Sequence, residues 1–78
     1  MDLAEDVCGC IEEVLEIKKG SVTEKNTADD TENWDSLGQL RIIMALEEKY
    51  AVRFKTEEIP ELNSVEKLAE RLGEMRAV

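Results

Sequence analysis

Apolar residues recur every three or four positions in three separate segments of this chain, which is the spacing of helices that each bury one face. The first segment runs over Leu3–Lys18, and Gly20 is the expected stop after it. The second segment covers Leu37–Tyr50 and follows Asp35, a favourable N-cap residue. It contains no proline and only one early glycine. The pattern therefore predicts helices rather than strands.

The remaining segments are shorter. Asn63 and Glu66 form a capping-box pattern before a closing helix. Its inward positions are expected to be Val65, Leu68, Ala69 and Leu72. Thr56 is a possible cap for one short helical turn, which Pro60 would end because proline disfavours helical geometry in the residue before it. Residues 50–54, "YAVRF", alternate like a short strand, but no second strand is evident, so we expect an apolar connection.

These elements predict an all-α fold in a single domain over residues 1–78. The chain has 78 residues, enough for a small bundle with a thin core. We expect three main helices, one short third helix, and a long polar loop, "GSVTEKNTADDTEN", between the first two. The acids of this loop do not form a calcium-binding EF-hand, because counting from Asp29 places Trp34 where that motif needs glycine.

The charge is strongly acidic. Nineteen acidic residues against ten basic ones give a net charge of −9. This field repels nucleic acid and anionic membranes and favours basic partner surfaces. The sequence shows no signal-peptide pattern and no apolar run that could span a membrane, so we expect a cytoplasmic protein. Cys8 and Cys10 are the only cysteines, and the sequence has no histidine and no second cysteine pair that could complete a metal site with them. We therefore interpret them as packing or incidental thiols.

The second helix carries two apolar stripes, whereas an isolated amphipathic helix needs only one. Successive residues lie about 100° apart around a helix. The expected core face consists of Ile42, Ile43, Leu46 and Tyr50. A separate stripe consists of Leu37, Leu40 and Met44. This second stripe either packs on the short helix or the long loop, or forms a contact surface for a partner.

Ser36 lies where the polar loop meets the second helix. The chain contains no histidine to activate this hydroxyl, and no G-x-S-x-G turn surrounds it. Ser36 is therefore a poor nucleophile on its own. The first turn of a helix does favour an anion, so a phosphate ester would be stable there. From these residues alone, a simple helix-start serine remains the preferred interpretation.

Taken together, "DSL" at the start of a helix after a long polar loop, the "DSLGQLRIIMALEEKY" helix, the short "TEEI" turn and the closing "SVEKLAERL" helix resemble the phosphopantetheine-dependent acyl carrier proteins. The resemblance covers nearly the whole chain. It implies that Ser36 carries a 4′-phosphopantetheine arm, which a separate phosphopantetheinyl transferase attaches from coenzyme A. Acyl groups would then be held as thioesters on the terminal thiol of the arm.

The resemblance also implies roles for the neighbours of Ser36. Asp35 would help the transferase to place its magnesium-bound coenzyme A, and Leu37 flanks the attachment site. The residues assigned to partner docking are Leu37, Leu40, Arg41, Met44, Glu47 and Glu48. The expected partners are acyl-loading and acyl-using enzymes with basic docking patches, and the carrier is expected to be a monomer. A further hypothesis is that the interior near Ile43, Leu46 and Ile59 shelters the acyl chain.

Two departures indicate a specialised carrier rather than one serving bulk fatty-acid synthesis. Common fatty-acid carriers have Glu-Leu where this chain has Arg41-Ile42, and often an acid at the position of Gly38. In the segment 36–50, Arg41 and Lys49 balance Glu47 and Glu48, so the segment has no net charge.

Three alternatives remain. An aminoacyl or peptidyl carrier usually shows Gly-Gly-x-Ser, where this chain has "NWDS". An unmodified acidic helical adapter would function without Ser36. A serine-dependent enzyme, the most distant alternative, would turn over simple esters or thioesters.

Overall fold

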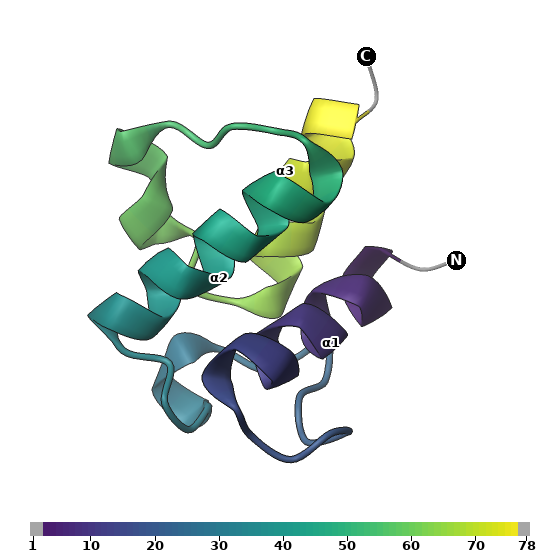
Figure 1. The fold of residues 1–78 in the computed structure, drawn as a ribbon, viewed down its shortest axis with the longest axis vertical. Coiled ribbons are helices and arrows are strands. Elements are labelled where there is room, and N and C mark those ends of the chain that lie inside the picture. The colour runs from purple at the N-terminus through teal and green to yellow at the C-terminus, as the bar shows by residue number, and fades with distance from the viewer. Residues whose placement is uncertain (1–2, 77–78) are drawn as a thin grey trace.

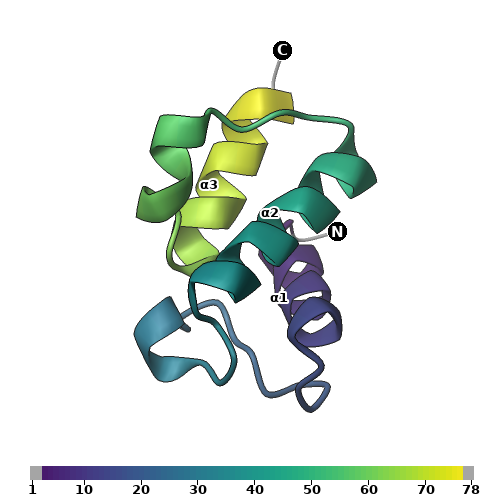
Figure 2. The ribbon, with the colours of Figure 1, turned by 60° about the vertical axis from the view of Figure 1, so that its left-hand side comes forward.

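The computed structural model describes residues 3–76, and all the regular elements of this part of the chain are helical. In chain order they are α1 (Leu3–Leu15), the 3-10 helix η1 (Ala28–Asp30), α2 (Ser36–Tyr50), the 3-10 helix η2 (Thr56–Glu61) and α3 (Val65–Arg76). Helix α1 packs against α2 and α3, and η2 packs on α2 (Figures 1 and 2). The predicted all-α bundle with a long first loop is confirmed.

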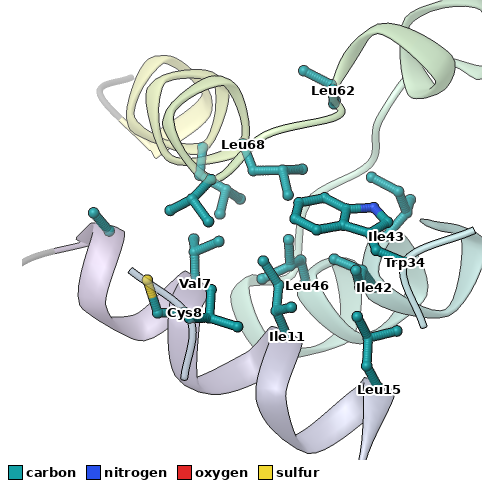
Figure 3. Packing of buried hydrophobic residues seen from close by; sticks show 14 of the residues in the cluster. Val7, Cys8, Ile11, Leu15, Trp34, Ile42, Ile43, Leu46, Leu62 and Leu68 are labelled. Carbon is teal, nitrogen blue, oxygen red and sulfur yellow. The ribbon is translucent and has the colours of Figure 1, made fainter. Parts of the chain in front are cut away.

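The core lies between the three long helices. Figure 3 shows side chains of α1, α2 and α3 pointing toward one another, with the indole of Trp34 reaching into the same space from the end of the loop. Of the expected core face of α2, Ile42, Ile43 and Leu46 are buried, while Tyr50 is half-buried. The prediction of this face from helical spacing is confirmed.

Helix α1 ends at Leu15, so the predicted end at Lys18 is wrong. Glu16 adopts a left-handed backbone conformation with φ of 56°. The N–H of Ile17 then donates to the carbonyl oxygen of Glu12 at 3.1 Å, which closes the helix in a Schellman motif. The partly buried Ile17 packs against the core. This contact outweighs the cost of placing a residue other than glycine in the left-handed region, and Gly20 is not the helix stop.

Helix α2 begins and ends close to the predicted residues. Asp35 is its N-cap, as expected, and Ala51 follows Tyr50 with φ of 55°. Residues 52–55 form an irregular connection rather than a strand, as expected. The side chain of Phe54 is buried, which holds this connection against the core.

Two predicted caps are wrong. Thr56 is the first residue of η2, which Lys55 precedes, and Pro60 lies inside this element rather than at its end. The N–H of Leu62 donates to the carbonyl oxygen of Ile59 and closes η2 beyond the proline. At α3, the Oγ of Ser64, not the side chain of Asn63, accepts the N–H of Lys67 at 3.1 Å.

Candidate functional site

Ser36 is the first residue of α2 and is exposed. Within residues 3–76, no hydrogen bond joins its hydroxyl to another residue. The Oδ1 of Asp35 accepts the N–H of Gly38 at 2.8 Å, which caps the helix. The first turn also presents the positive end of the helix dipole. The hydroxyl is thus free to react with an external group, and an anion attached there is electrostatically favoured.

The long loop that leads to Ser36 is anchored on α1 by two hydrogen bonds. Glu12 is buried, and its Oε2 accepts the N–H of Val22 at 3.0 Å. Asn33 has φ of 67°, and its Nδ2 donates to the carbonyl oxygen of Leu15 at 3.1 Å. Because both ends of the loop are bound to α1, the position of Ser36 is set by the helical core.

The same loop is also bound to the start of α3. The N–H of Ala28 donates to the carbonyl oxygen of Asn63 at 2.8 Å, and the N–H of Val65 donates to that of Asn26 at 3.1 Å. Within the loop, the N–H of Thr27 donates to the carboxylate of Asp30, and this hydrogen bond lowers the pKa of Asp30. The loop before Ser36 is therefore an ordered platform despite its polar composition.

Gly38 lies where the loop passes closest to α2. A Cβ at this position would collide with the backbone carbonyl oxygen of Asn33 and would lie 3.0 Å from Cδ2 of Leu15. The glycine that the sequence shows in place of a common acid is therefore required by packing. It lets the turn that contains Asn33 lie directly against the helix that carries Ser36.

A buried polar network joins the loop, α2 and η2. The Nε1 of Trp34 donates to Oε1 of Gln39 at 2.6 Å. The Nε2 of Gln39 donates to the carbonyl oxygens of Ile59 at 2.6 Å and Leu62 at 2.9 Å. We call the side chains of Trp34 and Gln39 the clasp. Because every polar atom of the Gln39 amide has a partner, burial of this side chain is not penalised.

A groove of about 510 Å³ opens beside Ser36, between the start of α2 and η2. Its walls include the clasp together with Leu40, Ile59 and Pro60. Most of these side chains are apolar, and among the described residues that line the groove only Asp35 is ionisable. A chain attached to the Ser36 hydroxyl can therefore lie in this groove without leaving the surface of the protein.

The second stripe of α2 faces outward. Leu37 is 66% exposed, Leu40 49% and Met44 65%. Of the two interpretations of this stripe, packing against the loop or η2 is excluded for Leu37 and Met44, and Leu40 only borders the groove. The three side chains form an exposed apolar surface, which we call the α2 stripe, next to Ser36.

The charged residues assigned to docking differ in their surroundings. Arg41 is exposed and lies 3.9 Å from the exposed carboxylate of Glu16, a contact of little energetic weight. Glu48 is exposed, whereas Glu47 is half-buried and its Oε2 accepts the N–H of Phe54 at 3.0 Å. Glu47 thus also holds the connection after α2, a contact that sequence reasoning missed.

Sequence reasoning also missed the role of Gln39. The only signal was a long amide within an otherwise apolar helical face, next to a tryptophan that precedes the helix. Trp34 is buried and donates its indole N–H to Gln39.

Other expected features can be stated briefly. Cys8 is buried and Cys10 half-buried, and burial raises the pKa of the Cys10 thiol. Over residues 3–76 we find no cluster of three or more potential metal ligands. None of the helices in this range is long and apolar enough to cross a bilayer.

Comparisons with known proteins agree with this geometry. Residues 5–72 match the model of a family described as "Phosphopantetheine attachment site". No curated protein matches the sequence significantly. Among solved structures, the holo acyl carrier protein from Geobacter metallireducens is similar, with 26% sequence identity and a TM-score of 0.84, over 99% of this chain and 88% of that one. The resemblance to acyl carrier proteins inferred from the sequence is thereby confirmed.

The residues of the site fit a 4′-phosphopantetheine group, since the exposed hydroxyl of Ser36 lies at a helix N-terminus and borders a mainly apolar groove. The chain belongs to the family of carrier proteins with a phosphopantetheine attachment site, and its prosthetic group is covalently bound 4′-phosphopantetheine.

Proposed function

We propose that this protein is an acyl carrier protein that holds acyl groups on a 4′-phosphopantetheine arm attached to Ser36. The observation that carries the proposal is the exposed, unbonded hydroxyl of Ser36 at the first position of α2, inside the region that matches the family. Both other serines are less suitable, because Ser64 is buried and Ser21 donates its hydroxyl to the carbonyl oxygen of Lys18.

Ser36 acts as the acceptor of the arm, and a separate transferase supplies the activation. The Oγ–phosphorus bond forms as the pyrophosphate of coenzyme A is cleaved, and the nucleotide leaves with the other phosphate. The hydroxyl proton passes to a base of the transferase, since no basic side chain of the described residues contacts Ser36. Asp35 caps the first turn of α2 and contributes an exposed carboxylate in the residue next to Ser36. The terminal thiol of the bound arm then carries the acyl group as a thioester.

Partner enzymes would recognise the α2 stripe and the charges beside it. Leu37, Leu40 and Met44 provide an apolar contact, with Arg41 and Glu48 exposed on the same helix. Glu47 has only one oxygen left for a partner, because the other accepts the Phe54 N–H. The net charge of −9 would steer the carrier toward basic surfaces. We propose that it works as a single-domain monomer over residues 1–78, in the cytoplasm.

We further propose a dedicated biosynthetic pathway rather than bulk fatty-acid synthesis. The docking helix has no net charge, and Arg41 replaces an acid common in fatty-acid carriers. A partner enzyme that selects this carrier would therefore place a carboxylate against Arg41, next to the apolar patch with which the enzyme contacts the α2 stripe. Efficient support of ordinary fatty-acid elongation would contradict this specialisation.

Mass spectrometry of the intact protein tests the proposed function. The protein is incubated with coenzyme A, magnesium and a phosphopantetheinyl transferase of broad specificity. We expect the gain of one phosphopantetheinyl group in the wild-type protein and in the control Ser21→Ala, and no gain in Ser36→Ala. Unchanged mass of the wild-type protein with several transferases would overturn the proposal and favour the adapter. Modification of Ser36→Ala would place the arm elsewhere.

A further inference from the structure

The clasp lies between the groove beside Ser36 and the interior of the bundle. Trp34 and Gln39 line the groove, yet Trp34 is only 6% exposed and Gln39 9%. Figure 3 shows the indole of Trp34 among core side chains of α2 and α3. A chain that passes from the groove into the core between Trp34 and Gln39 must therefore displace one of these two side chains.

Displacing Gln39 would break bonds that have no replacement. Its Nε2 is bonded to two carbonyl oxygens near the end of η2, those of Ile59 and Leu62, and its Oε1 accepts the indole N–H of Trp34. An alkyl chain offers no donor or acceptor in exchange. Separation of α2 from η2 by such a chain would leave buried polar groups unpaired, which is strongly unfavourable.

The space behind the clasp is also filled. Ile43 is 2% exposed and Leu46 is fully buried, and both pack in the common core with Leu62 and Leu68. Protein interiors of this kind admit an added chain only by rearrangement. The outer groove, in contrast, is open to solvent and is lined by Leu40, Ile59 and Pro60.

We propose that Gln39 closes the space between α2 and η2, so that the arm at Ser36 and its cargo stay in the outer groove. This inference rests on the proposed function and concerns where the cargo lies. It replaces the hypothesis that the interior near Ile43, Leu46 and Ile59 shelters the acyl chain. The groove suits an uncharged segment, because its one carboxylate, that of Asp35, is directed to the N–H of Gly38. The carrier therefore presents thioesters of short and long acyl groups equally.

The test compares acetyl and octanoyl forms, both loaded from the corresponding acyl-coenzyme A by the transferase and verified by intact mass. Cleavage of each thioester by hydroxylamine is followed with time, and methyl NMR spectra of the two forms are compared. We expect cleavage rates equal within about twofold, since a solvated thioester is not protected by its chain. We also expect chemical-shift differences at Leu40 and Ile59 but not at Ile43 or Leu46.

Burial of the chain would give a different result. Each methylene that leaves water shifts the equilibrium toward the buried form by about fourfold. Octanoyl protein that is cleaved more than tenfold slower than acetyl protein, or that shows shifts at Ile43 and Leu46, would overturn the proposal. A protein that gains no arm at all would overturn both this inference and the proposed function, so the two failures are distinguishable by mass.

Two variants test whether the side-chain amide of Gln39 keeps the acyl chain out of the core. Gln39→Leu removes the bonds to Ile59 and Leu62, and we expect its octanoyl form to become more than tenfold protected. Trp34→Phe is the matched control, because it removes the indole donor and part of the ring but leaves both Gln39 bonds to the carbonyl oxygens of Ile59 and Leu62. Its two forms should be cleaved alike. Protection absent from a folded Gln39→Leu protein would overturn the role of Gln39. If that variant does not fold, the wild-type comparison decides alone.

Discussion

The substitution Gly38→Ala tests whether the loop is held against α2 as the structure shows. The added Cβ would collide with the backbone carbonyl oxygen of Asn33 and would lie 3.0 Å from Leu15 Cδ2 and 3.3 Å from Asp35 Oδ1. The carbonyl cannot withdraw alone, since the Asn33 side chain donates to the carbonyl oxygen of Leu15. Relief of the collision requires that the turn before Ser36 move away from the helix.

The expected magnitude follows from two opposing effects. Alanine in place of glycine within a helix stabilises by about 1 kcal/mol through backbone entropy and propensity. Overpacking a tight contact costs about 1–3 kcal/mol. The net destabilisation of Gly38→Ala is therefore about 0–2 kcal/mol. Gly9 in α1 is the matched control, because no atom lies within 4 Å of a Cβ built there. Gly9→Ala should gain the full stabilisation, about 1 kcal/mol.

Urea and thermal unfolding, followed by circular dichroism, measure both variants. We expect the midpoint of Gly9→Ala to rise by about 4–8 °C, which corresponds to about 1 kcal/mol in a domain of this size. The free energies of unfolding of the two variants should differ by about 1–3 kcal/mol. Equal stabilisation by both substitutions would refute the reasoning, because it would mean that the Asn33 carbonyl is not fixed against Gly38.

Three further predictions concern the cap, an ion pair and the docking surface. Asp35→Ala should lower the free energy of unfolding by about 1 kcal/mol in urea titrations, whereas Asp35→Asn should lose less; equal losses would contradict the capping role. Arg71 Nε donates to Glu58 Oε1 at 2.7 Å and holds the pKa of that carboxyl below its ordinary value. The stability that Glu58 contributes is therefore present above the ordinary pKa of a glutamate and is lost as the pH falls through the lowered pKa of the folded state. Glu58→Gln should be less stable than the wild-type protein near neutral pH and equally stable in strong acid. Met44→Gln should change stability by less than about 0.5 kcal/mol, because this side chain is exposed, yet raise the KM of partner enzymes for the carrier at constant kcat; an unchanged KM would exclude Met44 from docking.

Much of the fold follows from local sequence signals. Helical spacing located α2, its core face and its second apolar stripe, because the side chains of a helix are distributed by a fixed angle per residue. That this stripe faces outward was decided by the tertiary structure. Asp35 was identified as the cap because the residue before a helix must satisfy a nearby free N–H. The position of Ser36 at the first turn follows from the same two signals, and so does the favourable electrostatics for an attached phosphate.

Local signals did not predict the ends of two helices, because contacts with other parts of the chain decide where these helices stop. Gly20 and Lys18 suggested a later end for α1, but burial of Ile17 favoured an earlier turn at Glu16. Pro60 suggested an end to η2, yet a 3-10 helix continues through it.

The clasp was decided by tertiary structure alone. Helical spacing places position 39 on the core face of α2, but it does not show which groups would bond a buried amide there. Its partners Ile59 and Leu62 lie 20 and 23 residues further along the chain, and their carbonyl groups meet it only after η2 packs on α2. The need for glycine at position 38 arises in the same way, from the approach of the Asn33 carbonyl. Periodicity and capping act within one turn of helix, whereas burial of a polar group depends on partners that only the folded chain brings together.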